Sequence, residues 1–217
     1  MTGTTATHAD GRIARGNQTR QLVLKRTVEI ASVEGLEGLS LGRLATELKL
    51  SKSGVFALFG SKEELQLATV RAAIKVYLEH VVQPTREIPP GIRRLWGVCT
   101  AWLTYSEQRV FPGGCFFYSV SAEYDAREGK VHDTIASARA NWFSFLGQTF
   151  EEAQRAGEAQ EGIDIPQLVF EIVALLETAN AESVLHDDFT CYEKAAKGIL
   201  SRLRGAATDP ALLPDTP

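Results

Sequence analysis

The sequence predicts an all-α protein of about nine helices, in which a small N-terminal three-helix domain precedes a larger helical domain. Three observations predict this fold class. Apolar residues recur at spacings of three and four along most of the chain, as on one face of a helix. No segment alternates apolar and polar residues in the manner of a half-buried strand. Serine, aspartate, glycine and proline residues stand where the periodic segments would begin and end as helices.

Residues 1–18 are polar, contain glycine and show no periodic pattern, so we expect a disordered N-terminal arm. Arg12 and Arg15 of this arm could follow a DNA groove, although an inert tail is the simpler interpretation. A first helix is expected over residues 19–34. Gly35 suits the left-handed position that commonly follows the end of a helix.

Residues 39–65 carry the most informative local pattern of the chain, with two short helices, a tight turn and the start of a third helix. Ser40, Ser51 and Ser61 each precede a periodic apolar segment and can cap a helix. Ser61 followed by Glu64 has the spacing of a capping box. Two helices joined by a short turn form a helix-turn-helix unit, whose second helix fits the major groove of DNA. We therefore place a domain of this type over residues 19–62.

The larger helical domain is expected over residues 63–205. Its first helix, residues 62–82, connects the two domains and ends before Pro84, because proline lacks a backbone N–H. Pro112-Gly113-Gly114 interrupts the apolar pattern, and Asp164 can cap a helix that has Pro166 in its first turn. Residues 206–217 are rich in proline and are expected to form a frayed tail. The remaining helices are expected at residues 91–108, 115–126, 130–156, 165–185 and 191–203.

Charge is unevenly distributed along the chain. Residues 1–62 carry nine Lys and Arg against five Asp and Glu, whereas residues 63–217 carry 14 against 22. The basic end coincides with the helix-turn-helix pattern, as binding to phosphates requires. No run approaches the ~20 apolar residues of a membrane span, and the N-terminus lacks a signal-peptide core. We therefore expect a cytoplasmic protein that does not associate with membranes.

A further set of residues carries a resemblance to a known family. The set comprises Arg20, Gly35, Ser40-Leu41, Ala45, Ser51-Lys52-Ser53-Gly54 and the run FALFGSKEEL at residues 56–65. In these positions residues 19–80 resemble the N-terminal DNA-binding domain of TetR-family (tetracycline-repressor-like) transcriptional regulators. Two positions depart from the family pattern. Phe56 stands where a tyrosine is usual, and Leu58 stands where tyrosine or histidine is common.

The resemblance implies that the second helix of the helix-turn-helix unit enters the major groove of an operator. Lys52, Ser53 and Gly54 would then lie at its exposed start, where base edges are reached. Arg43 is a candidate for a guanine or a phosphate, because arginine can bind either in a bidentate manner. Solvated surface side chains are the alternative interpretation. The candidate DNA-binding residues are Arg20, Ser40, Arg43, Lys52, Ser53, Gly54, Phe56 and Lys62.

Residues 96–150 hold all three tryptophans and six of the ten phenylalanines. Aromatic walls with a few polar groups are typical of a small-molecule pocket, and the resemblance implies a pocket in this domain. For any single residue, core packing is the simpler interpretation. The candidate lining residues are Trp96, Cys99, Leu103, Phe111, Phe116, Val120, Trp142, Phe145 and Leu146. Tyr118, Glu177 and Asn180 are candidate polar contacts. We expect an effector that is small and largely apolar, and neither a cofactor nor a metal.

The last two helices carry apolar stripes that suit a helix–helix interface. Leu168, Ile172, Leu175 and Ala179 form one stripe, and Ala195 and Ile199 belong to the other. The resemblance implies that these helices pair with their copies in a four-helix bundle, and a two-fold dimer would match a palindromic operator. The alternative is that these stripes only close the subunit's own core.

Together these observations favour a homodimeric, ligand-responsive regulator, most simply a repressor that a small molecule releases from its operator. One alternative is an architectural DNA-binding protein without a ligand. Another is a sensor based on Cys115, since a helix N-terminus lowers the pKa of a thiol. An enzyme is not expected, because no phosphate loop or nucleophile elbow appears. The pairs Glu128/His132 and Glu182/His186 have the i,i+4 spacing that could bind a metal on one helix face. Neither pair is joined by a second such pair in the sequence, so ordinary helix-surface pairs are the better interpretation.

Overall fold

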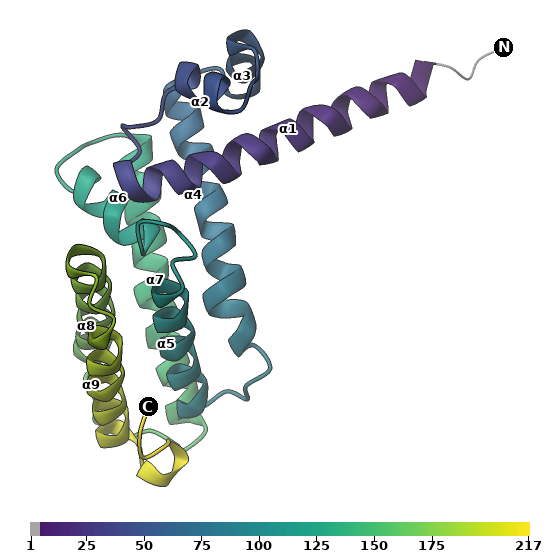
Figure 1. The fold of residues 1–217 in the computed structure, drawn as a ribbon. Coiled ribbons are helices and arrows are strands. Elements are labelled where there is room, and N and C mark those ends of the chain that lie inside the picture. Colours follow the sequence, from purple (N-terminus) through teal and green to yellow (C-terminus); the bar gives the residue numbers. More distant parts are fainter. Residues whose placement is uncertain (1–4) are drawn as a thin grey trace.

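The computed structural model describes residues 5–217, with side chains from residue 16 onward. Within this range the fold consists of nine α-helices, and a single bridge between Ala159 and Ala207 is the extent of β-structure. Figure 1 shows α1 to α3 at one end of an elongated molecule and α8 with α9 as an antiparallel pair toward the other end. The predicted all-α class is confirmed. The helices are α1 (Thr5–Glu34), α2 (Leu41–Glu47), α3 (Lys52–Phe59), α4 (Lys62–Tyr77), α5 (Ile92–Glu107), α6 (Phe116–Tyr124), α7 (Lys130–Arg155), α8 (Ile165–His186) and α9 (Thr190–Ala206).

The caps predicted from the sequence hold the starts of α2, α3, α4 and α8. Each capping side chain accepts a hydrogen bond from a backbone N–H three residues later, which satisfies a donor that a helix start leaves free. Gly35, at φ 77°, takes the left-handed conformation after α1, as predicted. The capping pairs are Ser40 with Arg43 (3.3 Å), Ser51 with Gly54 (3.1 Å), Ser61 with Glu64 (3.1 Å) and Asp164 with Gln167 (3.1 Å).

The N-terminal arm differs from the prediction of disorder over residues 1–18. Residues 1–4 lie outside the described residues, but α1 already begins at Thr5 and runs without a break to Glu34. The reason is that adding a residue to an existing helix costs far less than starting one, and no proline interrupts residues 5–18. Figure 1 shows this first half of α1 projecting away from the rest of the molecule.

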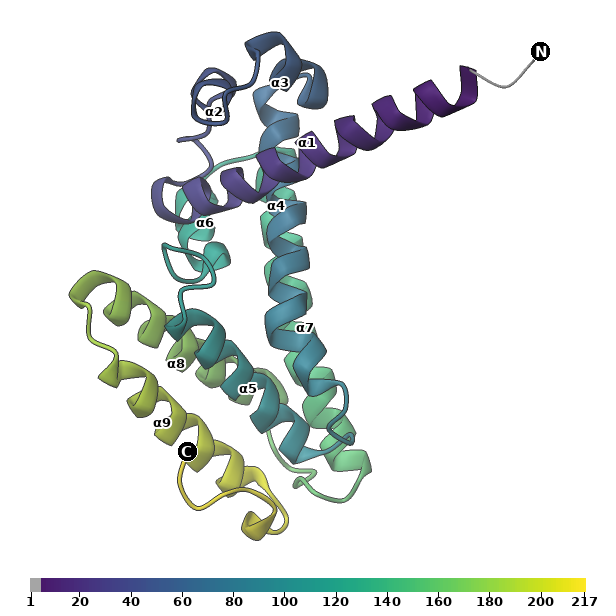
Figure 2. The ribbon, with the colours of Figure 1, turned by 45° about the vertical axis from the view of Figure 1, so that its right-hand side comes forward.

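The helix α4 leaves the small domain and runs along α7 into the larger one, as the views of Figures 1 and 2 both show. Its continuation departs from the predicted single helix over residues 62–82. After Tyr77 the chain widens into a π-helical turn, Leu78–Val82, followed by a 3-10 turn, Gln83–Thr85. Pro84 explains the change, because it has no N–H to donate to the carbonyl four residues earlier. Such π turns are frequent at functional sites.

The C-terminal tail is packed, so the prediction of a frayed segment over residues 206–217 is wrong. Leu213 is buried, and Thr208 N–H donates to the carbonyl of Glu158 at 3.0 Å. Arg93 donates to the carbonyl of Leu212 at 2.8 Å, and Arg204 donates to that of Pro214 at 2.7 Å. Arg93 and Arg204 therefore hold the C-terminal segment in place. The prolines of this segment restrict the unfolded chain, so less conformational entropy is lost when the segment becomes ordered.

Candidate nucleic-acid interface and cavity

The start of α3 is the most open surface of the helix-turn-helix. Lys52, Ser53 and Gly54 are exposed, and the Phe56 ring is 54% exposed on the same helix. Val55 and Phe59 point inward and are buried. The helix therefore presents a short polar end and one exposed ring, which is the form that a recognition helix needs. Lys49, which the sequence pattern did not indicate as a DNA contact, is exposed in the turn before α3 at φ 54°.

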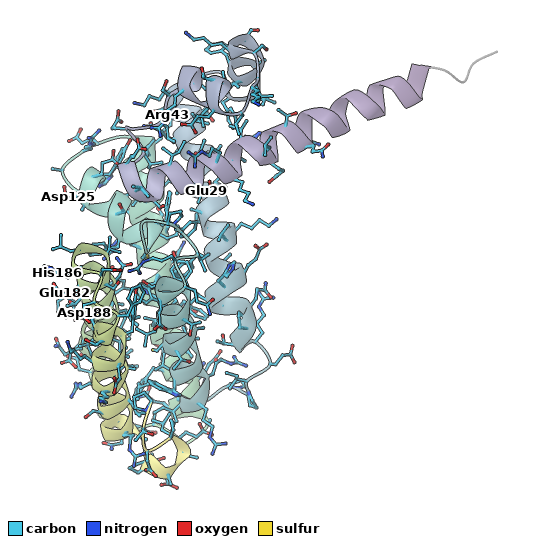
Figure 3. All side chains as sticks on the ribbon, viewed as in Figure 1. Glu29, Arg43, Asp125, Glu182, His186 and Asp188 are labelled. Carbon is cyan, nitrogen blue, oxygen red and sulfur yellow. The ribbon has the colours of Figure 1, made fainter. Side chains whose placement is uncertain are left out.

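Arg43 is engaged within the domain. Its guanidinium donates two hydrogen bonds to Glu34 and one to Glu47, and these carboxylates raise its pKa further above the ordinary value. Glu47 also accepts from Arg26 at 2.8 Å. Figure 3 shows Arg43 where α2 approaches the end of α1. To contact a guanine or a phosphate, Arg43 would have to exchange these carboxylate partners.

The other cations predicted to position phosphates also have partners. Lys62 Nζ lies 2.8 Å from both the carbonyl and the Oε2 carboxylate oxygen of Glu37. The Arg20 guanidinium lies over the Phe59 ring, 4.8 Å from its centroid, a cation–π contact. Ser40 uses its hydroxyl as the α2 cap. Of the predicted DNA-binding set, Lys52, Ser53, Gly54 and Phe56 therefore form the most available surface.

The larger domain contains a partly open cavity of about 340 Å³ between α4, its π turn, α5, α7 and α8, beside the start of α6. Five of its fifteen lining residues are aromatic. The rings of Trp142 and Phe145 are stacked with centroids 5.9 Å apart, and Tyr77 meets Trp142 edge-on at 5.3 Å. Arg139 and Glu177 form an ion pair at the cavity. The lining residues are Ile74, Tyr77, Leu78, Val82, Trp102, Cys115, Phe117, Ala138, Arg139, Asn141, Trp142, Phe145, Val173, Leu176 and Glu177.

Some of the predicted ligand contacts line the cavity, and others lie elsewhere in the structure. Trp142, Phe145 and Glu177 line the cavity, whereas the other predicted contacts do not. Most of those others are buried in the core instead. Tyr77 and Phe117 were missed because α4 was interpreted as a connector and because neighbouring rings on α6 face opposite ways. The residues that do not line it are Trp96, Cys99, Leu103, Phe111, Phe116, Val120, Leu146, Tyr118 and Asn180.

Asn180 is held in a buried hydrogen-bond network and is not a free polar contact. Its Oδ1 accepts from Ser106 Oγ at 2.9 Å and from the backbone N–H of Cys115 at 2.6 Å. Tyr192 Oη lies 2.8 Å from the same Ser106 hydroxyl and accepts from Arg109 at 2.7 Å. The network joins α5, α8 and α9 to Cys115, the residue that precedes α6. The Asn180 side chain therefore helps to hold these elements together.

Cys115 lies at the cavity but does not have the activated thiol that the alternative of a thiol-based sensor requires. Burial raises the pKa of the Cys115 thiol, and the nearby N–H groups at the start of α6 offset this only in part. Burial likewise raises the pKa of Cys99, to about 12. Because the thiolate is the reactive form, the structure gives no support to a sensor based on Cys115.

The nine-residue helix α6 connects the cavity to the helix-turn-helix domain. Phe117 in its first turn lines the cavity. At its other end, the Glu123 carboxylate accepts hydrogen bonds from the backbone N–H groups of Leu36 and Glu37, at 2.7 and 2.8 Å. Tyr124 Oη donates to Glu37 at 3.0 Å. The turn between α1 and α2 is therefore bound directly to the helix that begins at the cavity.

Glu37, in the turn between α1 and α2, contacts side chains of both domains. Lys62 and Gln66 approach it from α4, while Tyr124 and Arg127 approach it from the end of α6. The hydrogen bond from Lys62 is the main reason that the pKa of Glu37 falls to about 2. Glu37 is therefore ionised across the physiological range, and its charge is shared by partners on two helices.

The predicted dimer stripe turns inward. Most of the predicted interface residues are buried inside the subunit, where α8 packs on α9, and Leu175 is half-buried against Gly198. The opposite face of α8 is exposed and apolar, with Phe170 61% and Leu185 74% exposed. The predicted stripe is the more hydrophobic of the two faces of α8, and the more hydrophobic face of a helix usually packs on the core. The inward residues are Leu168, Ile172, Ala179, Ala195 and Ile199.

The scattered histidines form no larger site in the described part of the chain. Glu182 and His186 are 3.6 Å apart, and Figure 3 shows them beside Asp188 near the α8–α9 turn. His132 pairs with Asp133 at 2.9 Å. Among the described residues, no group of three or more His, Cys, Asp or Glu could hold a metal ion. No helix in the same range is long and apolar enough to cross a membrane.

Comparison with known proteins assigns the two domains to one class of DNA-binding regulator. Residues 23–69 match the family of bacterial regulatory proteins called tetR, and residues 91–199 match the tetracyclin repressor-like C-terminal domain. The chain therefore belongs to the TetR family of bacterial regulatory proteins. Members of this family are DNA-binding transcriptional regulators with a ligand-binding C-terminal domain. A search of curated proteins finds no match.

Solved structures share the fold at low sequence identity. A TetR transcriptional regulator from Chloroflexus aurantiacus is 21% identical with a TM-score of 0.81, and the alignment covers 89% of this chain and 98% of that one. A TetR-family regulator from Cytophaga hutchinsonii is 19% identical with a TM-score of 0.80, covering 90% and 98%. A putative regulator from Saccharomonospora viridis, solved in complex with choline, is 16% identical with a TM-score of 0.74, covering 88% and 98%.

Proposed function

We propose that this chain is a homodimeric repressor that binds a palindromic operator through α3 and leaves it when a small, largely apolar molecule occupies the cavity. The observation that carries this proposal is the position of α6. Phe117 at its start lines the cavity, and Glu123 at its end binds the turn between α1 and α2. A change at the cavity therefore has a short, hydrogen-bonded route to the helix-turn-helix.

The mechanism is a shift between two populated arrangements of the dimer. A ligand that fits better when Phe117 moves would favour a displaced α6, and Glu123 would carry the α1–α2 turn with it. Because α2 follows directly from that turn, the separation of the two α3 helices in the dimer would change. The ligand and the operator would then favour different states, which is negative coupling between two sites.

The DNA surface we propose is centred on the start of α3. Lys52, Ser53 and Gly54 approach base edges, while Phe56 packs against the sugar–phosphate backbone. Lys49 in the turn adds a second cation for which no ion pair is found in the described residues. Arg43, Lys62, Arg20 and Ser40 belong to a second set, since each must first exchange a partner within the protein.

The ligand site we propose is the aromatic cavity. Its volume of about 340 Å³ lies near the lower end of the range for small-molecule pockets, about 300–1,000 Å³. The regulator from Saccharomonospora viridis, of the same fold, was solved with a small molecule, choline. An architectural DNA-binding protein would need no such cavity, so the cavity favours a ligand-responsive regulator.

The proposal is tested by selecting binding sites from a random DNA duplex library and measuring affinity for the selected site. We expect a palindromic site and a protein dimer on it. Lys52→Ala should weaken binding to the selected site more than binding to unrelated duplexes, because we place Lys52 at base edges. Lys197→Ala on α9 is the matched control and should leave both affinities unchanged. Failure to select any duplex, or an unchanged preference for the selected site in Lys52→Ala, would contradict the assignment.

A further inference from the structure

The cavity opens to solvent on one side. Of its fifteen lining residues only Leu78 and Asn141 are exposed, and the others are buried or half-buried. Leu78 begins the π turn that follows α4 and is 44% exposed. Asn141 lies on α7, and Figures 1 and 2 both show α4 running along α7. The opening therefore lies between the π turn and α7.

The charged residues of the cavity lie on a different side of α7. Because successive residues turn by about 100° around a helix, Arg139 and Asn141 project on opposite sides of Trp142. Arg139 forms its ion pair with Glu177 of α8. These are the two charged residues among those that line the cavity, and each already has the other as its partner. The opening itself is lined by an aliphatic side chain and an amide.

The amide of Asn141 is available to a ligand. Asn141 is exposed, and no hydrogen-bond partner of its side chain is found in the described part of the chain. It is three residues from Ala138 and four from Phe145, two other lining residues, so all three share one face of α7. A side-chain amide offers two N–H donors and a carbonyl acceptor. It can therefore bind an uncharged polar group that enters the opening.

The interior of the cavity is aromatic and apolar. The rings of Trp142 and Phe145 are stacked with centroids 5.9 Å apart, and Phe117 contributes a further ring from α6. Aromatic side chains contribute stacking and edge-to-face contacts beyond simple burial. The volume of about 340 Å³ suits a molecule of one or two rings. The cavity is thus apolar within and hydrogen-bonding at its opening.

We propose that the cavity selects an uncharged amphipathic molecule of one or two aromatic rings, which inserts its ring past Leu78 and leaves its polar group at the opening with the Asn141 amide. This inference rests on the proposed function, because it takes the cavity as the effector site. It goes further in naming the chemical class of the ligand, its orientation and the residue that selects its polar group.

The first experiment tests the role of Asn141 with naphthalene and 2-naphthamide, which differ by one carboxamide. Binding to the full-length protein is measured by calorimetry. In Asn141→Ala we expect 2-naphthamide to bind roughly two- to tenfold more weakly, whereas naphthalene should keep its affinity. Gln148→Ala is the matched control, because it removes an exposed amide of α7 that does not line the cavity. It should change neither affinity.

The second experiment tests the orientation of the ligand. N-(2-methoxyethyl)-2-naphthamide carries a flexible chain on its polar end, and 6-(2-methoxyethyl)-2-naphthamide carries the same chain on the far end of the ring. The first chain would extend through the opening, so its affinity should stay within about twofold of 2-naphthamide. The second chain would press on the packed interior, so its affinity should fall roughly tenfold or more.

Four outcomes would overturn the proposal. They are an equal loss for both probes in Asn141→Ala, equal tolerance of the two chains, tighter binding of 2-naphthoate than of 2-naphthamide, and no binding of any probe. The proposed function is judged separately, by operator binding and by release with any effector. A protein that is released from its operator by a charged molecule, and binds none of these amides, would keep that function and refute this inference.

Discussion

The carboxylate of Glu123 accepts a hydrogen bond at 2.7 Å from the backbone N–H of Leu36, across 87 residues of sequence. Leu36 follows the glycine that ends α1, and it is fully buried in the core of the small domain. A single side chain of the ligand-binding domain therefore holds the backbone from which the helix-turn-helix begins. This contact adds a hydrogen-bonded attachment to the apolar core that the two domains share.

Replacing Glu123 should weaken communication between the domains. In Glu123→Ala the N–H groups of Leu36 and Glu37 lose their acceptor, so their protection from hydrogen exchange should fall roughly two- to tenfold. Operator affinity without ligand should change little, whereas release by the ligand should be reduced. Glu128→Ala, which removes a nearby exposed carboxylate, is the control. Unchanged exchange at Leu36 would show that the contact is not formed in solution.

The junction at Glu37 should respond to acid. Its pKa in the folded protein, about 2, lies below the ordinary value of 4.5, mainly because of Lys62. A carboxyl with a lowered pKa stabilises the folded state fully above about pH 4.5, and this contribution is lost as the pH falls toward 2. Because Glu37 is nearly half exposed, the effect should be modest, up to about 1 kcal/mol. Urea unfolding of the wild type and Glu37→Gln should converge over this range, and a constant difference would contradict the assignment.

The buried network around Asn180 should matter for stability rather than for ligand selection. Asn180→Ala leaves the Cys115 N–H and the Ser106 hydroxyl without their acceptor, which should destabilise the fold by about 1–3 kcal/mol. Urea unfolding measures the loss, with the exposed Glu182→Ala as control. An unchanged free energy of unfolding in Asn180→Ala would contradict this role of Asn180.

The features predicted correctly from the sequence are those determined by neighbouring residues. The Ser40, Ser51, Ser61 and Asp164 caps require only a side chain and an N–H three residues away, so the sequence reveals them directly. Gly35 is a similar local signal. The cavity is different, because its walls come from five segments, and periodicity does not say which neighbour each helix face meets. Tyr77 and Phe117 could be recognised as cavity residues only once α4, α6 and α7 were placed together.

The charged contacts show the same limit on prediction. Arg43 and Lys62 were predicted as DNA contacts because the pattern of the helix-turn-helix places them on its surface. Their carboxylate partners, Glu34 and Glu37, lie nine and 25 residues away, so the pairing depends on how α1 ends and turns. The dimer stripe was misassigned for a related reason. Nearly every face of α8 is apolar, and such a helix is usually covered on both sides.

The exposed face of α8 should form the dimer interface. Phe170, Ala174, Ala181 and Leu185 follow one another at intervals of four, seven and four residues, on the side opposite the buried stripe. Exposed apolar patches of this kind mark interaction sites. A second copy is the partner we expect, because two α3 helices are needed for a palindromic operator. Phe170→Glu and Leu185→Glu should each place a charge in the interface and shift the dimer toward monomer in sedimentation at micromolar concentration. Leu22→Glu, at an exposed apolar residue on α1, should remain dimeric. Dimers of unchanged stability in both α8 variants would place the interface elsewhere, and a monomeric wild type would exclude the two-fold arrangement altogether.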